Sequence, residues 1–152
     1  MGITVKELIG DSTLQAKAMK CVADKAETLA SVSLMDLSVE AECFGAEVMM
    51  SDGEVPTVKG RMINDMDEAE ALQIPEVGSG RTQLYIDAIE KACKEITDRP
   101  VLAGMIGPFS LAARLLDVSE IMMDCYDDPE LLTINTLENA IYMSMQNDLS
   151  FK

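Results

Sequence analysis

The clearest pattern in this chain is an apolar run from Val101 to Ile106 that ends abruptly at Gly107-Pro108. A helical pattern of apolar positions begins immediately afterwards, at Phe109. A continuous apolar run of this kind is typical of a strand buried on both faces, as strands in parallel sheets are. Strand, tight turn and helix together form the building block of parallel α/β folds, in which functional residues gather at the carboxyl ends of the strands.

A second core strand is predicted where Val32, Leu34 and Asp36 alternate among strand-forming residues. A helix over 39–44 follows, which Ser38 can cap and the next glycine ends. Because helices separate the two strands, the strands should pair in parallel through a right-handed crossover. The predicted fold class is therefore α/β, although two core strands cannot close a barrel, which needs eight in this architecture.

Amphipathic patterns predict helices over much of the remaining chain. Thr4 and Glu7 have the spacing of a capping box, and Ser12 with Gln15 repeats that signal at the start of a longer helix. The apolar face of this longer helix is predicted to carry Leu14, Ala18, Cys21, Val22 and Leu29. A helix over 83–96 should turn inward Leu84, Ala88, Ile89, Ala92, Cys93 and Ile96. The other predicted helices cover residues 65–72, a stretch from 109, 119–125 and 130–146.

A β-hairpin is predicted between residues 48 and 58. Two β-prone runs, 48–50 and 55–58, flank the Asp52-Gly53 pair, which is a strong turn signal between such runs. Pro56 restricts the second arm to a sheet edge. We find no internal repeat, low-complexity tract or linker in the sequence, so residues 1–152 are interpreted as one domain.

Composition and charge exclude several classes of function. The net charge of −15 argues against nucleic-acid binding, because a phosphate backbone needs clustered Lys and Arg. The chain has no apolar stretch of bilayer-spanning length and does not begin like a signal peptide, so we expect a cytoplasmic protein without a membrane partner. His is absent and the four Cys are widely spaced, so we expect buried thiols and no metal site in this chain.

Asp36 is the strongest candidate for a catalytic residue. It should lie near the carboxyl end of its strand, where a buried carboxylate needs a hydrogen-bond donor or a cationic group. The ordinary alternative is an Asp that caps the following helix, a role for which Ser38 competes. Glu40 and Glu42 follow two residues apart, so at most one of them points into a site, and both lying in solvent is the simpler alternative. Glu40 is our candidate for substrate binding.

Two glycine-containing loops are the remaining candidates for binding sites. Gly107, Pro108 and Phe109 should lie on the same rim as Asp36, where Gly lets the backbone approach a substrate and the new helix favours an anionic group. We assign these three residues to substrate binding, with a turn selected for its geometry alone as the alternative. The Gly78–Arg81 loop lacks a preceding strand and the full glycine fingerprint of a phosphate site, so it is interpreted as a flexible loop.

A family resemblance is carried by two segments, 33–48 and 99–116. The first reads Ser-Leu-Met-Asp-Leu-Ser-Val-Glu-Ala-Glu-Cys-Phe-Gly-Ala-Glu-Val, and the second contains the strand, turn and helix described above. Both segments are similar to those of the uroporphyrinogen decarboxylase superfamily, which also contains the methylcobamide:coenzyme M methyltransferases. With the parts around them, the resemblance covers most of the chain. It implies an amino-terminal portion of a (β/α)8 TIM barrel with a β-hairpin insertion.

The resemblance favours the corrinoid-linked methyltransferase branch, through the stretch 36–45 and the absence of an arginine-rich amino-terminal motif. It implies that the full-length protein moves a methyl group from a corrinoid protein to a thiol, and that the isolated chain is inactive. In that branch, zinc on a His-x-Cys element and a later Cys activates coenzyme M. Those ligands lie in the carboxyl-terminal half, and nothing like them is present here.

Two alternative functions stay open. In porphyrinogen decarboxylases the aspartate at the position of Asp36 binds the pyrrole NH groups of the tetrapyrrole substrate, and the reaction needs no cofactor. A non-catalytic remnant that acts in binding or assembly is the other alternative. A partial barrel also leaves strand edges and apolar side chains uncovered, so we expect a homodimer or higher oligomer whose interface includes residues 101–109.

Overall fold

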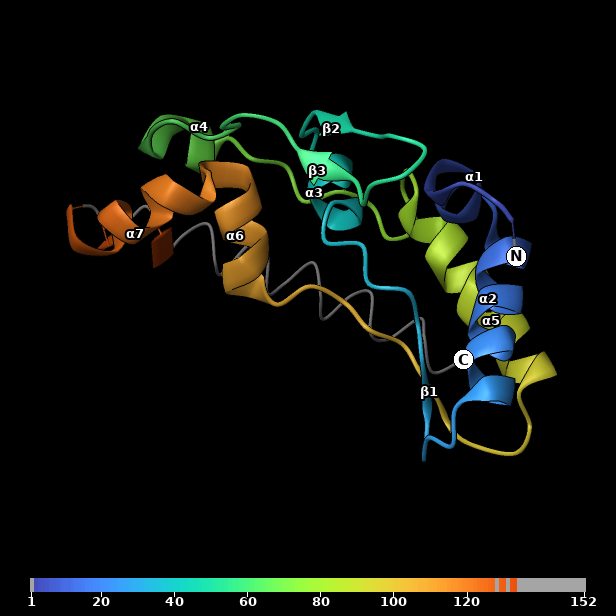
Figure 1. Cartoon of the computed structure of the whole chain (residues 1–152). Helices are drawn as coiled ribbons and strands as arrows, with labels where there is room; N and C mark the ends of the chain where they lie inside the picture. Colours follow the sequence, from blue (N-terminus) through green and yellow to red (C-terminus); the bar gives the residue numbers. More distant parts are fainter. Residues whose placement is uncertain (1, 128, 131, 134–152) are drawn as a thin grey trace.

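The computed structural model describes residues 2–127, 129–130 and 132–133, and within them short strands are interspersed among helices (Figure 1). The elements follow one another as α1 (Val5–Ile9), α2 (Ser12–Lys25), β1 (Ser31–Val32), α3 (Val39–Cys43), β2 (Val48–Met49), β3 (Thr57–Val58), α4 (Met66–Glu70), α5 (Thr82–Glu95), β4 (Val101–Leu102), α6 (Pro108–Leu116) and α7 (Val118–Asp127). No helix in these ranges is both long and apolar enough to cross a membrane. The predicted helix over 130–146 falls mostly outside the described residues.

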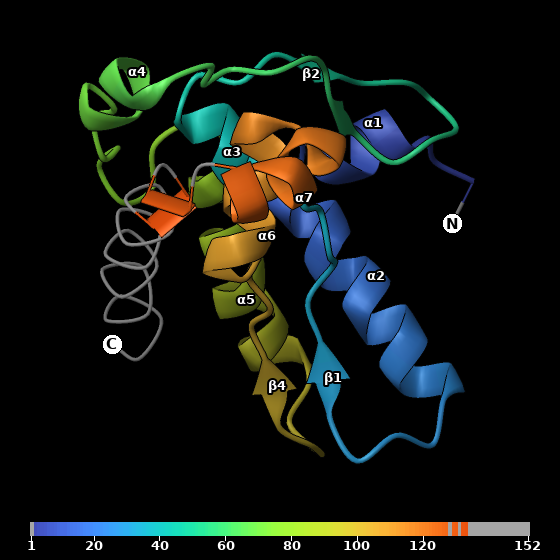
Figure 2. The same ribbon diagram turned by 90° about the vertical axis from the view of Figure 1, so that its left-hand side faces the viewer.

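A parallel pair of strands, β1 beside β4, connects the first half of the chain to the second (Figure 2). Ser31 lies opposite Val101 in this pair. The pairing ends where the Gly104 N–H donates to the hydroxyl of Ser33, at 2.8 Å, instead of to a backbone carbonyl. The predicted parallel pairing is therefore confirmed, and both strands are shorter than predicted.

The prediction of a strand over 101–106 that is buried on both faces is wrong. Only Val101–Leu102 is a strand, Leu102 is 51% exposed, and Gly104 is exposed as well, whereas Ile106 is buried. The physical reason is that β4 pairs with one strand only in the described structure. An apolar run predicts burial on both faces only when the sheet continues and both of its faces are covered.

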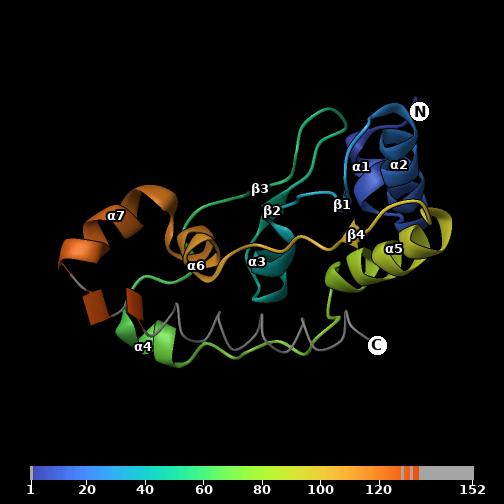
Figure 3. The same cartoon turned by 90° about the horizontal axis from the view of Figure 1, so that it is seen from below.

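Two long helices, α2 and α5, lie side by side and cover one face of the β1–β4 pair (Figures 2 and 3). Small side chains allow this close packing, in a cluster made of Ala16, Met19, Ala23, Ala92 and Ile96, with Ile89 and Val101 against it. Across the same interface, the Lys91 ammonium donates to the hydroxyls of Ser12 and Thr13, at 2.7 and 2.9 Å.

The predicted face of α2 is wrong. Its buried positions are Gln15, Ala16, Met19 and Ala23, while Val22 is exposed and Leu29 lies in solvent beyond the end of the helix. The cap is also one residue earlier than predicted, because the Asp11 carboxylate accepts from the N–H groups of Thr13 and Leu14. The prediction chose the face that carries Leu and Val because these residues are more hydrophobic than Ala. Helix α5 packs closely against α2, and close packing favours small side chains such as Ala at the contact.

A second core lies where α3, α6 and the start of α7 meet (Figure 1). Its fully buried large side chains are Ile63, Leu111, Leu115, Leu116 and Ile121. Beside it, β2 and β3 pair antiparallel, with Val48 opposite Val58. Gly107 caps α6 and Pro108 occupies its first turn, where proline needs no N–H partner. This core fixes the position of α3, which carries two carboxylates of the site described below.

Candidate functional site

Asp36 and Gly107 follow the two strands, and because the strands are parallel, the segments that contain these residues leave the pair at the same end. Asp36 stands between β1 and α3, and its side chain is only 3% exposed. The backbone N–H of Ile106, just before Gly107, points to the Glu40 carboxylate of α3 at 3.5 Å. The segments that leave the two strands therefore meet at this rim.

The Asp36 carboxylate is held by four hydrogen bonds. Its Oδ1 accepts from the backbone N–H and the hydroxyl of Ser38, at 3.0 and 2.6 Å. Its Oδ2 accepts from Nη1 of Arg81 at 2.7 Å and from the Tyr85 hydroxyl at 2.9 Å. Burial raises the pKa of Asp36, but the donors from Ser38 and Arg81 outweigh burial and hold this pKa below its ordinary value. Asp36 is therefore a fixed negative charge at neutral pH.

Arg81 connects two carboxylates and a hydroxyl. Besides its ion pair with Asp36, it donates from Nε to the Glu42 carboxylate at 2.5 Å and from Nη2 to the Ser38 hydroxyl at 3.0 Å. The residue stands at the start of α5, after a turn in which Gly78 and Gly80 have φ of +82° and +56°. Those left-handed conformations favour glycine. The loop interpreted as flexible thus places the guanidinium of the site.

Tyr85 lies one helical turn after Arg81 and contacts the same carboxylate. Burial and the neighbouring Asp36 charge raise the pKa of Tyr85, so its hydroxyl keeps its proton and donates. Sequence reasoning missed both Arg81 and Tyr85. The available signal was their spacing of four along an amphipathic helix, which puts both side chains on the face turned toward Asp36.

The alternative in which Glu40 and Glu42 both lie in solvent is wrong. Glu42 pairs with Arg81, while Glu40 is only 7% exposed and is the more deeply buried carboxylate. Burial raises the pKa of Glu40. Helix α3 turns the two side chains to different partners: Glu42 to the Arg81 guanidinium and Glu40 to the Ile106 N–H.

Asp36, Glu40 and Tyr85 line a cavity of about 400 Å³ between α5 and the segments that leave β1 and β4. Gly107, Pro108 and Phe109 lie at the start of α6, outside the lining of this cavity, and Phe109 is largely exposed. The structure thus brings Asp36 and Glu40 together and leaves the Gly107 loop on the rim. Substrate contact by that loop stays a prediction.

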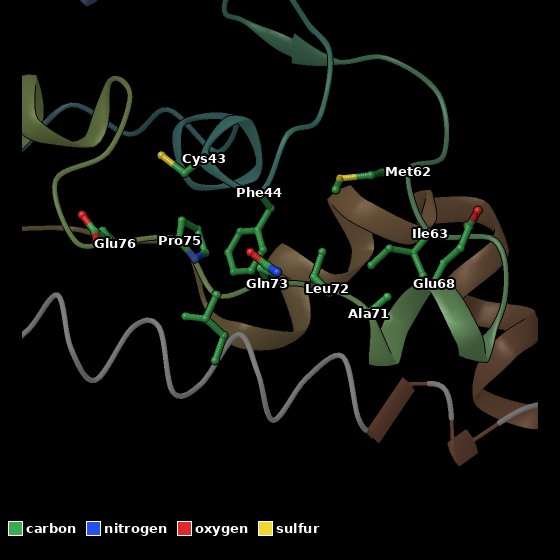
Figure 4. Close-up of a pocket in the computed structure, with 11 residues that line it drawn as sticks. Cys43, Phe44, Met62, Ile63, Glu68, Ala71, Leu72, Gln73, Pro75 and Glu76 are labelled. Carbon is green, nitrogen blue, oxygen red and sulfur yellow. The ribbon is translucent and has the colours of Figure 1, made fainter.

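A second, more open hollow of about 630 Å³ lies on the far side of α3. Cys43 and Phe44 from the end of α3, Met62 and Ile63, and the segment 71–76 line it (Figure 4). Glu68 and Glu76 are its charged residues, and neither contacts the Asp36 cluster in the described structure. We therefore place the candidate site at Asp36 and not in this hollow.

The described residues do not fit a zinc site. No group of three or more Cys, Asp or Glu side chains in this part of the chain is arranged to hold a metal ion, and the sequence has no His. Cys43 instead donates its thiol to the Ser79 carbonyl at 3.0 Å. The Asp36 carboxylate accepts hydrogen bonds from Ser38, Arg81 and Tyr85, and the Glu40 carboxylate is buried beside it.

A parallel strand pair covered by helices, with a cluster of charged residues at its carboxyl end, defines a segment of an α/β protein whose functional residues lie at that end. The chain belongs to the uroporphyrinogen decarboxylase (URO-D) family, whose profile matches residues 1–146.

Two curated relatives and one solved structure that are similar to this chain are methyltransferases. The methylcobamide:CoM methyltransferase MtbA of Methanosarcina acetivorans is 35% identical over 85 residues, which are 53% of this chain and 24% of that protein. The protein of the same name from Methanosarcina mazei is 31% identical over a stretch of equal length. A solved methyltransferase from Methanosarcina mazei superposes with a TM-score of 0.81 at 23% identity, covering 97% of this chain and 46% of the other. This chain therefore spans about a quarter of the curated relatives and about half of the solved structure.

Proposed function

We propose that this chain is part of a corrinoid-linked methyltransferase that moves a methyl group from a corrinoid protein to a thiol. The observation that carries this proposal is the 35% identity over 85 residues to a methylcobamide:CoM methyltransferase. The similar solved structure supports the same fold over nearly the whole chain. A corrinoid protein is accordingly the proposed partner, and the cytoplasm is the proposed compartment.

The proposed architecture is an amino-terminal portion of a (β/α)8 barrel, with residues 1–152 forming one incomplete domain. In this interpretation β1 and β4 are neighbouring barrel strands, α5 is the helix of the crossover between them, and the β2–β3 pair is an insertion in that crossover. The parallel register of β1 and β4 and the packing of α2 and α5 on one face support this interpretation.

In this function Asp36 provides a fixed negative charge. Because its pKa is lowered and Ser38, Arg81 and Tyr85 hold both oxygens, the carboxylate suits stabilisation of positive charge and not proton transfer. Glu40 and the Gly107–Phe109 loop are the proposed substrate contacts.

Porphyrinogen decarboxylation is the second candidate, and the description of the matching family favours it. A carboxylate that accepts N–H donors on both oxygens, as Asp36 does here, could also accept the pyrrole NH groups of a tetrapyrrole. The missing arginine-rich amino-terminal motif argues against this candidate. A non-catalytic role in binding or assembly is the third candidate.

The test compares two reactions in the same preparation. The 152-residue chain, and separately this chain with any coding sequence that follows Lys152, would be incubated with methylcobalamin and 2-mercaptoethanesulfonate, or with uroporphyrinogen. We expect methyl transfer by the longer protein and none by the isolated chain. Release of CO₂ from uroporphyrinogen without methyl transfer would establish the second candidate instead, and the absence of both activities would favour the third.

The role of Asp36 is tested in the active protein. Asp36→Ala should lower the methyl-transfer rate by about a hundredfold or more, the lower range for loss of a group that stabilises charge in the transition state. Asp24→Ala removes a carboxylate of the same residue type from an exposed pair with Lys20, and serves as the control. Thermal unfolding of both variants separates a loss of activity from a loss of folded protein. An Asp36→Ala variant with undiminished turnover would remove Asp36 from the site.

A further inference from the structure

The cavity beside Glu40 has the size and lining of a small-molecule site. Its volume of about 400 Å³ lies within the range of ligand pockets in proteins. Apolar side chains make up much of its wall, among them Met35, Ile86, Ile89 and Met105. Such a wall suits the apolar body of a ligand, while the few polar groups determine which end of the ligand lies where.

One polar group in this wall lacks a partner. Oε1 of Glu40 accepts from the Ile106 N–H at 3.5 Å, but Oε2 is buried and accepts no hydrogen bond from any described residue. Burying a carboxylate oxygen without a donor is costly, and native structures contain few such atoms. A ligand that donates a hydrogen bond to Oε2 would remove this cost.

The charges around the cavity favour a cationic donor. Among the described residues, Asp36, Glu40 and Glu90 line it, and neither Lys nor Arg does. The nearby Arg81 already donates to Asp36, Glu42 and Ser38, so it does not satisfy Glu40. A metal ion is not favoured, because no group of three suitable side chains is present in the described part of the chain. An organic cation would supply both the missing hydrogen-bond donor and a charge opposite to those of the lining carboxylates.

We propose that this cavity binds a small protonated alkylamine, whose ammonium donates to Oε2 of Glu40 and whose alkyl chain packs against Ile86, Ile89 and Met105. The amine site shares Glu40 with the proposed substrate contacts but does not depend on methyl transfer, because an amine can bind to the chain whether or not the chain takes part in catalysis. The two proposals can therefore fail independently.

The test is a binding titration followed by NMR on the ¹⁵N-labelled 152-residue chain. The probes are n-butylammonium, butyramide and butyrate, which have similar size and differ in charge. We expect n-butylammonium to shift the Ile106 amide resonance saturably, because that amide contacts Glu40. Butyramide and butyrate should bind about tenfold or more weakly, as expected when a charged hydrogen bond is lost.

Two variants complete the test. Glu40→Gln keeps the shape of the side chain and removes its charge, and it should weaken n-butylammonium binding to the level of the neutral probe. Glu95→Gln makes the same change at an exposed position on α5 outside the cavity lining, and it should bind as the unchanged chain does. Equal affinity for all three probes, undiminished binding by Glu40→Gln, or no saturable shift at Ile106 in the unchanged chain would each overturn the proposal.

Discussion

At the residue scale, one guanidinium determines the state of the site. Arg81 contacts Asp36, Glu42 and Ser38 at once, and its side chain is 12% exposed. Three carboxylates lie in this small region, with Arg81 as the cation that two of them contact. A chain with 27 acidic and 12 basic residues has few cations to place, so the position of this one is informative.

Removing Arg81 should destabilise the chain strongly. Arg81→Met leaves the buried Asp36 carboxylate without its cation, and the free energy of unfolding should fall by about 3–5 kcal/mol, as found when one partner of a buried pair is removed. The control is Lys94→Met, which breaks the exposed pair with Glu90 and should change little. Urea unfolding measures both. A loss at Arg81 no larger than at Lys94 would show that the cluster is not a stabilising unit.

Glu40 should make stability depend on pH. Burial raises its pKa in the folded chain, so between its ordinary pKa and the raised value the folded state binds more protons than the unfolded state. Stability due to this group therefore falls as pH rises through that window. The charged groups that act on Glu40 are Asp36, which raises its pKa further, and Arg81, which opposes this.

Glu40→Gln should remove that decline and should be more stable than the unchanged chain above the window. Thermal unfolding between acidic and neutral pH measures both effects, with Glu95→Gln as the matched exposed control. A parallel pH dependence in the unchanged chain and in Glu40→Gln would mean that Glu40 does not titrate differently on folding.

At the element scale, local signals predicted the helices and strands better than their faces. The Thr4–Glu7 capping box appears as predicted, the helix predicted over 65–72 covers Met66–Glu70, and the helix predicted from Phe109 begins at Pro108. Each of these signals depends on neighbours in the sequence. The buried face of α2 could not be predicted, because it depends on how closely α5 approaches. Asp36 was predicted from its place after a strand, whereas Arg81 comes from a loop that has no motif and reaches Asp36 only through the fold.

Asp117, at the junction of α6 and α7, has a strained backbone and also caps α7. Its φ of +79° and ψ of +134° lie in a sparsely populated region, which costs a non-glycine residue about 1–3 kcal/mol. Its carboxylate also accepts from the Ser119 N–H at 2.8 Å and so caps α7. Asp117→Ala loses the cap and keeps the strain, and should cost about 1 kcal/mol or more. Asp117→Gly loses the cap but relieves the strain.

We therefore expect Asp117→Gly to be the more stable of the two variants, measured as the difference in denaturant midpoint. Asp127 lies at the end of α7, outside this junction, and Asp127→Ala serves as a control for removing an acidic side chain from the same helix. If the Ala and Gly variants unfold at the same midpoint, backbone strain at position 117 is negligible.

At the scale of the whole molecule, the described structure has one well-covered and one poorly covered side of the parallel pair. Helices α2 and α5 cover one face, whereas Val32, Met35 and Leu102 are each more than half exposed. The sequence predicted the parallel pair but not its exposure, because an apolar run contains no information on whether its neighbours are present. Exposed apolar side chains gathered near strand edges favour association.

Self-association should follow from that exposed side. We expect the chain to form dimers or larger assemblies at micromolar concentration in light scattering, and Leu102→Lys should shift it toward the monomer without lowering its unfolding temperature. Leu29→Lys, which changes an exposed residue beyond the end of α2, is the control. A monomer that binds no hydrophobic dye would contradict the expectation.

The hydrogen bonds of β1 predict how fast its backbone amide protons exchange with solvent. The Ser31 and Ser33 amides donate to the carbonyls of Pro100 and Leu102, at 2.8 and 3.0 Å, so the Val32 amide between them points to the other edge of the strand. In deuterated solvent the Val32 proton should exchange quickly and its two neighbours slowly. If another strand docks along that edge, from a second copy or from further chain, Val32 exchange should slow while the exchange of its neighbours stays the same. The exchange rate at this single backbone position thus indicates whether the sheet has been extended.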